Sequence, residues 1–182
     1  MTTPQDADVP ATPVLMSDAS TSHLPIPTGF VELPSVGPAG FNTLCGPIWI
    51  KAESDSLVGG FRVEQRHCNP SGNCHGGMIA TFCDLHLAMA AIFQARLAVF
   101  LIPTINLSVD YLAPTLIGAW VEARAEIAKI TRGMVFVNEI VMADGEPVAR
   151  ANAIYKIPSA DITREGITPR DTGAFLREWL QR

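Results

Sequence analysis

The sequence predicts an α+β domain in which one long helix packs against an antiparallel sheet, and three observations support this. Residues 76–99 contain no proline and place apolar side chains at helical intervals. Residues 118–131 alternate between apolar and charged side chains, as a half-buried strand does. Asp144-Gly145 is a dipeptide that favours a tight turn between antiparallel strands. Hairpins around a single long helix exclude a doubly wound parallel sheet.

Six strands and a short helix are predicted besides the long helix. Each strand is an apolar or alternating run bounded by turn-forming residues. The predicted strands are residues 41–51, 57–67, 103–112, 118–131, 134–143 and 147–157, with a turn at Ser54, Asp55 and Ser56. The short helix, 172–181, is amphipathic, with Phe175, Leu176, Trp179 and Leu180 expected to face inward.

The first 39 residues are predicted to form a flexible or extended arm, and residues 40–182 the domain. Residues 1–28 contain five prolines with many Thr, Ser and Asp, and show little periodicity. Contact of the arm with the domain is expected to begin at Phe30, Val31 and Leu33.

Composition narrows the function classes. The chain has 182 residues, of which 48% are hydrophobic and 17% charged, and these values fit one globular domain. The net charge of −5 and the lack of a basic tract argue against nucleic-acid and membrane-surface binding. No uninterrupted apolar run approaches a membrane span, and the first 50 residues contain no Lys or Arg, unlike a secretory signal. We therefore expect a cytoplasmic protein whose four cysteines are reduced.

Asp84 is a lone carboxylate inside the predicted apolar helix. One interpretation is an acid that pairs with Arg96 or faces water, but a solvent-facing helix surface would carry more than one charge. Small side chains surround Asp84 at helical spacing, so another chain or a ligand can approach this face closely. These neighbours are Gly77, Ala80, Thr81, Ala88 and Ala91.

The loop before the helix reads HCNPSGNCHGG, over residues 67–77. It contains the pattern Asn-x-x-Gly-x-x-His-Gly-Gly, with an acid seven residues after the last glycine. This pattern resembles the signature of the PaaI-type hotdog-fold acyl-CoA thioesterases. The matching residues are Asn69, Gly72, His75, Gly76, Gly77 and Asp84.

Two later segments extend the resemblance to roughly residues 40–157. PTINLSVDYLAPTLIG is similar to the family strand that ends in Tyr or Phe-x-x-Pro, and ITRGMVFVNEIV is similar to its Gly-Arg strand pair. Met134 departs from the pattern, because a basic or small residue is usual after Gly133. The resemblance implies a hotdog fold, in which a curved antiparallel sheet wraps one central helix. It also implies a homodimer or homotetramer with active sites at the subunit interface.

The resemblance implies hydrolysis of an acyl-CoA thioester, with a medium-chain acyl or an aryl group, and no cofactor. Asp84 would activate water or attack the carbonyl directly. Gly76 and Gly77 begin the helix, so their free N–H groups and the positive helix end would polarise the carbonyl oxygen. Asn69, across the interface, and Thr104 would orient the water or the thioester.

Other residues have less direct roles. His75 is either a general base or, as we favour, a residue that fixes the loop by hydrogen bonds. His86 is interpreted as structural, since it lies about 200° around the helix from Asp84. The residues expected to hold the CoA phosphates are Lys129, Arg132, Gly133 and Arg150, with Arg66 as a weaker candidate.

Three alternatives remain open. A zinc or iron site would use soft ligands that cluster around the loop, although the chain has no Cys-x₂-Cys pair. The second alternative is a hotdog protein that binds acyl-CoA without catalysis, and the third is a hotdog dehydratase, whose loop motif differs. An acyl-carrier protein as acyl donor is less favoured, because an acidic carrier would meet a chain of charge −5. The candidate metal ligands are His67, Cys68, Cys74, His75, Cys83 and His86.

Overall fold

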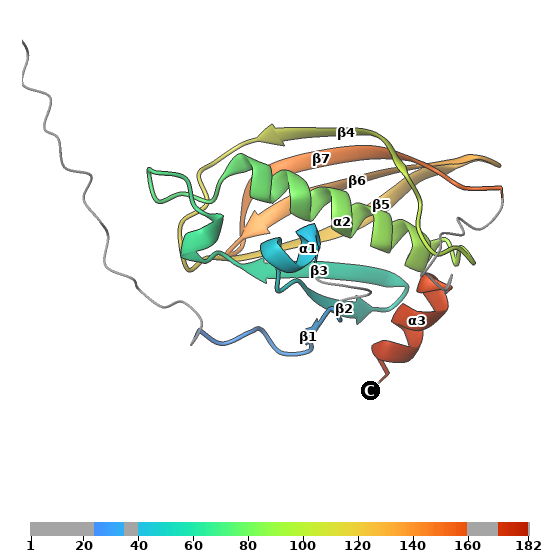
Figure 1. Cartoon of the computed structure of the whole chain (residues 1–182), viewed down its shortest axis with the longest axis horizontal. Helices are drawn as coiled ribbons and strands as arrows, with labels where there is room; N and C mark the ends of the chain where they lie inside the picture. Colours follow the sequence, from blue (N-terminus) through green and yellow to red (C-terminus); the bar gives the residue numbers. More distant parts are fainter. Residues whose placement is uncertain (1–23, 35–39, 160–170, 182) are drawn as a thin grey trace, which may run out of the picture.

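A seven-stranded antiparallel sheet wraps around one long helix, as Figure 1 shows. The computed structural model describes residues 24–34, 40–159 and 171–181. The strands follow the order β1-β2-β3-β5-β6-β7-β4, and this arrangement confirms the predicted α+β hotdog architecture. The strands are β1 (Val31–Glu32), β2 (Trp49–Glu53), β3 (Ser56–Arg62), β4 (Thr104–Tyr111), β5 (Trp120–Ile130), β6 (Met134–Ala143) and β7 (Glu146–Lys156). The helices are α1 (Phe41–Cys45), α2 (Gly76–Gln94) and α3 (Thr172–Trp179), with a 3₁₀ turn η1 (Gln65–His67).

Helix α2 supplies the centre of the core. It combines good helix formers with large apolar side chains, and Phe82 and Leu87 are fully buried. By length and composition α2 would also pass for a membrane-spanning helix. More than half of it is buried inside this fold, and the core packing accounts for its apolar composition.

The chain between residues 41 and 51 differs from the predicted strand. Residues Phe41–Cys45 form the short helix α1, whose first turn closes where the N–H groups of Thr43 and Leu44 donate to the Gly40 carbonyl. Strand β2 begins only after Pro47, which has no N–H for a sheet ladder. The prediction of a strand from residue 41 was therefore wrong, and the segment forms α1 instead.

The predicted strand 57–67 is also shorter than expected. β3 ends at Arg62, and η1 follows it. Nδ1 of His67 accepts a hydrogen bond from the Glu64 N–H at 3.0 Å, and this bond closes the turn. Burial lowers the pKa of His67, which keeps the ring neutral so that Nδ1 can act as an acceptor.

Helix α2 ends at Gln94, earlier than the sequence predicts. Arg96 has φ of 52°, in the left-handed region that usually holds glycine. The Leu97 N–H donates to the Ile92 carbonyl at 3.1 Å, and the Arg96 N–H donates to the Phe93 carbonyl at 3.3 Å. This pair of bonds is a Schellman motif, which satisfies the last carbonyls and stops the helix.

The described part of the N-terminal segment packs on the outer face of the sheet. β1 pairs with β2, and Phe30 is buried, with its ring 5.0 Å from the ring of Trp120. Arg62 donates to the Pro25 carbonyl at 2.5 Å. Contact with the domain thus begins before residue 40, while the predicted arm before residue 24 lies outside the described residues.

Removal of residues 1–28 is expected to lower the melting temperature by several degrees, on the scale of about 2–4 °C per kcal/mol for a chain of this size. The truncation deletes Ile26, which packs against Phe30 and Trp120, together with the acceptor for Arg62. Removal of residues 1–23 alone keeps these contacts and serves as the control. Equal melting temperatures for both truncations would contradict this packing role.

Candidate active site

The imidazole of His75 caps the N-terminus of α2. Nδ1 accepts a hydrogen bond from the Gly77 N–H at 2.8 Å, so the ring takes the place of a usual Ser or Asp cap. The His75 N–H itself donates to the His67 carbonyl at 2.7 Å, which ties the helix start to the preceding loop. These hydrogen bonds are those expected of a residue that fixes the loop, and the choice between this role and that of a base stays a prediction.

Fewer backbone N–H groups are free at Gly76 and Gly77 than the sequence predicted. We expected two free N–H groups, but the N–H of Gly77 donates to His75. Among the described residues, the N–H of Gly76 has no acceptor, so it is the donor left at the start of α2. The Tyr111 hydroxyl donates to the Gly76 carbonyl at 2.8 Å, and a Cβ on Gly76 would lie 3.1 Å from the Tyr111 ring. Glycine at this position thus permits close contact with β4.

Asn69 shapes the loop that leads to the helix. Its carboxamide oxygen accepts from the N–H groups of Ser71 and Asn73, at 2.9 and 3.3 Å. Gly72, with φ of 77°, completes the turn. The Asn69 N–H donates to the Asn73 carbonyl at 2.8 Å, so the two arms of the loop are joined.

Asp84 is half-buried on α2 and faces β4. Its Oδ1 accepts a hydrogen bond from the Thr104 hydroxyl at 2.7 Å, so the structure brings these two predicted residues together. Within the described part of the chain, no cation lies within 4.0 Å of the carboxylate, and Arg96 lies 3.8 Å from Asp55 instead. Pairing of Asp84 with Arg96 is therefore not observed, and Oδ2 remains available to a water or a substrate atom.

Tyr155 supports the backbone at the same point. Its hydroxyl donates to the Asp84 carbonyl at 2.9 Å. Burial, together with the nearby carboxylate of Asp84, raises the pKa of the Tyr155 phenol, so it stays a protonated donor. This bond fixes the helix where the carboxylate leaves it.

The predicted phosphate-binding cations lie at the surface. Lys129 is exposed near the end of β5 and Arg132 is exposed in the turn between β5 and β6, and neither forms an ion pair with another described residue. The carbonyl of Gly133 accepts from the Ile157 N–H at 2.9 Å, which anchors this turn near the beginning of β4. Arg150 differs, since its guanidinium pairs with Asp110 at 2.7 Å.

His86 contacts Glu139, a residue that the sequence analysis did not identify. Nδ1 of His86 lies 2.6 Å from a carboxylate oxygen of Glu139, and Nε2 lies 3.1 Å from the Leu57 carbonyl. Both side chains are fully buried. A Cβ on Gly59 would lie 2.5 Å from the His86 ring, so glycine is required there. The pair is structural, as predicted for His86.

The cysteines of the loop and helix remain protonated thiols. Burial raises the pKa of Cys83, with a further contribution from Glu139. Burial, with a smaller effect of Cys68, raises the pKa of Cys74 to about 12. Among the described residues, no group of three or more His, Cys, Asp or Glu side chains is placed to hold a metal ion.

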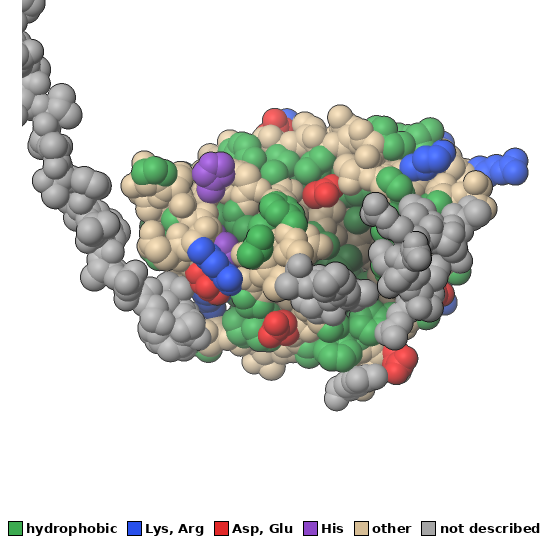
Figure 2. Space-filling model, in the orientation of Figure 1, with side chains coloured by type: hydrophobic (Ala, Val, Ile, Leu, Met, Phe, Trp, Pro, Cys, Tyr) green, Lys and Arg blue, Asp and Glu red, His purple; other side chains and the backbone are tan. Residues whose placement is uncertain are grey.

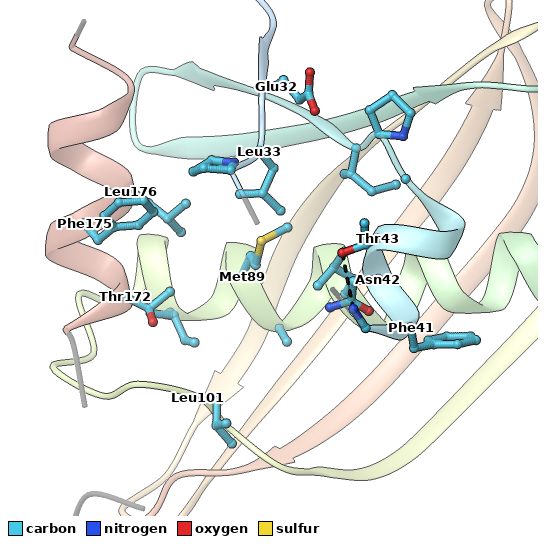
Figure 3. Close-up of a pocket in the computed structure, with 18 of the residues that line it drawn as sticks. Glu32, Leu33, Phe41, Asn42, Thr43, Met89, Leu101, Thr172, Phe175 and Leu176 are labelled. Carbon is cyan, nitrogen blue, oxygen red and sulfur yellow. Dashed lines mark hydrogen bonds between the residues drawn. The ribbon is translucent and has the colours of Figure 1, made fainter. Parts of the chain in front are cut away.

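An apolar cavity of about 630 Å³ lies between α2, α1 and α3. Figure 3 shows Met89 of α2 at its centre, with Phe41 of α1 on one side and Phe175 of α3 on the other. In the space-filling view, apolar side chains gather around a hollow in this face (Figure 2). No pattern in the sequence predicted this cavity, because it depends on how three separate segments pack.

Comparison with known proteins points to one superfamily. Residues 71–149 match the family model of the thioesterase superfamily. The protein PA0474 of Pseudomonas aeruginosa, which is named as an esterase, is 27% identical over 134 residues, covering 73% of this chain and 98% of that protein. Acyl-coenzyme A thioesterase 13 of Mus musculus is 29% identical over 87 residues, covering 48% of this chain and 61% of that protein.

Solved structures share the fold. Thioesterase superfamily member 2 of zebra fish superposes with a TM-score of 0.59 at 23% identity, over 66% of this chain and 88% of that one. The PaaI protein of E. coli gives a TM-score of 0.54 at 18% identity, over 60% and 82% of the two chains. These structures confirm the hotdog fold that the resemblance implied.

Proposed function

We propose that the chain, whose residues 71–149 match the family model of the thioesterase superfamily, is a thioester hydrolase that cleaves medium-chain acyl- or aryl-CoA thioesters with Asp84 as the catalytic carboxylate. The observation that carries this proposal is the position of Asp84. It is a half-buried acid with one hydroxyl donor, no cation within the described residues and small neighbours on its helix face. A substrate can therefore approach one carboxylate oxygen directly.

The chemistry follows from this geometry. As a general base, Asp84 takes a proton from water while the water oxygen attacks the thioester carbonyl. As a nucleophile, it attacks the carbonyl itself and forms an anhydride that water then cleaves. Either path gives the carboxylic acid and the free thiol of CoA. The bond from Thr104 holds Oδ1 in place, so Oδ2 is the reacting oxygen.

A second copy of the chain is needed to complete the site. Gly77 and Asp84 are seven residues apart on α2, about 10 Å along the helix axis. One thioester carbonyl can contact both the helix N-terminus and Asp84 only if each of these two protein groups lies about 3 Å from a carbonyl atom. The helix N-terminus and Asp84 of one copy are too far apart for this. We propose that the carbonyl oxygen meets the Gly76 N–H of one copy and that Asp84 comes from the other.

Strand β4 offers the surface for that second copy. Among the described strands it lies at one edge of the sheet and pairs only with β7, so its outer edge has backbone groups that no described strand pairs. Ile105, Tyr111 and Leu112 are each more than half exposed on or next to this strand. A free edge with large apolar residues is an aggregation hazard in a monomer, and pairing with another β4 removes it.

Replacement of Ile105 with Glu is expected to give a monomer whose kcat/KM is lower by about 10²–10³, the usual effect of losing an oxyanion donor. The charge lies on the free edge of β4. Ile140→Glu is the matched control, because Ile140 is 47% exposed on β6, away from that edge. Light scattering and turnover are measured together, and an active monomeric parent would overturn the shared site.

Lys129 and Arg132 are proposed to hold the CoA phosphates. Both are exposed without ion-pair partners in the described part of the chain, near the start of β4 that carries Thr104. Arg150 can contribute only if its pairing with Asp110 is exchanged for a phosphate. The cations act as surface charges, so their effect on KM would weaken as salt increases.

A panel of thioesters tests the proposed function. The parent protein is expected to hydrolyse acetyl-, octanoyl-, dodecanoyl-, benzoyl- and phenylacetyl-CoA at different rates, with medium-chain or aryl esters preferred. Release of free CoA thiol gives the rate. Binding without turnover on every ester would instead identify a non-catalytic acyl-CoA-binding protein.

A further inference from the structure

We infer that the cavity between α1, α2 and α3 binds the substrate's acyl group as a linear chain of about eight carbons, and that α3 limits its length. This inference rests on the proposed function, because it places the thioester at Asp84. It commits the cavity to one occupant, an unbranched acyl chain, instead of an aryl ring or a second copy of the protein.

The cavity begins next to the catalytic carboxylate. Leu85 follows Asp84 directly on α2, and Ala88 lies one turn further on the same side. The opposite wall contains Ile102, just before the Thr104 that hydrogen-bonds Asp84. An acyl chain attached to a carbonyl at Asp84 can therefore enter the cavity between the helix and this segment.

The cavity wall is suited to hydrocarbon. The α2 side consists of Leu85, Ala88, Met89 and Ile92. Arg66 is the cation in the wall, and its guanidinium already contacts the Gly46 carbonyl and Glu64. Burial of apolar substrate atoms against such a surface is the main source of affinity for a chain without polar groups.

The dimensions select a linear chain. Leu85 and Ile92 are seven residues apart, so this side of the cavity extends about 10 Å along the helix. Carbon–carbon bonds of about 1.5 Å in an extended zigzag cover that distance with about eight carbons. An aryl ring would fill only the part nearest Asp84, and the rest of the cavity would remain unfilled.

Helix α3 closes the far end. Phe175 and Leu176 line the cavity and pack against the core cluster that contains Ile92. The Thr172 hydroxyl donates to the Phe100 carbonyl at 2.5 Å, and the Thr172 N–H donates to the Val99 carbonyl at 3.1 Å. These bonds anchor α3, so its aromatic side chain forms a fixed wall.

The closing elements α1 and α3 are not part of the region that the family model matches. The family model matches residues 71–149, and both α1 and α3 lie outside that range. Gly76, Gly77 and Asp84 lie within it, whereas Asn69 lies just before it. Acyl length would therefore be selected by segments outside the matched region, which can vary without altering the chemistry.

The test uses S-alkyl-CoA thioethers from ethyl to dodecyl, which bind but cannot be hydrolysed. Titration calorimetry on the parent should show a Kd that falls about fourfold per methylene and levels off near eight carbons. Ala88→Leu fills the cavity and should abolish this dependence for longer chains. Phe175→Ala opens the far end and should shift the plateau to longer chains. Ala95→Leu, at the end of α2 and outside the cavity, should keep the parental profile.

The outcomes separate this inference from the proposed function. A parental length profile in both Ala88→Leu and Phe175→Ala would overturn the cavity assignment, even if the parent hydrolyses acyl-CoA. Length-dependent binding that both variants change, with no turnover in the parent, would support the cavity and reject the hydrolysis. A melting temperature for each variant shows that the fold is kept. If Phe175→Ala fails to fold, the comparison of Ala88→Leu with its control Ala95→Leu tests the cavity assignment.

Discussion

Asp84→Asn is expected to lower kcat by about 10²–10⁴, with the fold and the oligomeric state unchanged. Asparagine has nearly the same size and can still accept the hydrogen bond from Thr104, but it cannot ionise. Because no cation of the described residues contacts the carboxylate, removal of its charge breaks no ion pair, and stability should hardly change. Turnover of an ester that the parent hydrolyses, measured with the melting temperature, checks both statements.

Three further variants show what the loss in Asp84→Asn means. Thr104→Ala and Asn69→Ala remove positioning bonds and should cost less activity than Asp84→Asn. His75→Gln keeps a group that can accept from the Gly77 N–H, so it too should cost less. If His75→Gln loses as much activity as Asp84→Asn, the imidazole is the base. A normal kcat in Asp84→Asn would overturn the mechanism.

Glu139→Leu is expected to destabilise the protein by about 3–5 kcal/mol, because it leaves a buried imidazole without its partner. The Glu139 carboxylate lies 2.6 Å from His86, and water reaches neither side chain. The melting temperature should fall by roughly 10 °C on the scale for chains of this size. The folded fraction should keep its kcat, because the pair does not touch the proposed substrate path.

The double variant Glu139→Leu with His86→Leu provides the control. Replacement of both partners by apolar residues is often nearly neutral, so much of the lost stability should return. A double-mutant cycle measures the coupling between the two residues. If the loss of unfolding free energy in the double variant equals the sum of the losses in the two single variants, the contact contributes little to stability.

Local sequence patterns predicted much of this fold, namely those parts whose geometry depends on residues adjacent in the sequence. Asp144 and Gly145 adopt φ of 48° and 91°, the values that a two-residue hairpin turn requires. In β5, Val121, Ala123 and Ala125 are buried as their alternation predicts. The Asn-x-x-Gly-x-x-His-Gly-Gly motif and the acid seven residues after it were also visible in the sequence, and their catalytic role stays a prediction.

The errors have a common physical cause, which is tertiary context. Arg96 ends α2 in a conformation that costs an L-residue about 1–2 kcal/mol, so no local preference predicts the stop. The Gly77 N–H was expected to be free, but the side chain two residues earlier uses it. Glu139 did leave a signal, since it is the one acid among the inward positions of β6, between Val137 and Val141. A lone charge at a buried strand position should prompt a search for its partner.

The strand order also has a consequence for how the chain reaches this structure. β5, β6 and β7 form a local meander joined by short turns, and contacts of this kind form early in folding. Two other pairs close larger loops: β3 pairs with β5 across α2 and β4, and β4 pairs with β7 across β5 and β6. We expect the meander and α2 to form the folding nucleus and these two pairings to form after the transition state. Variants at Val137 should then slow folding, whereas variants at Val58 should mainly speed unfolding.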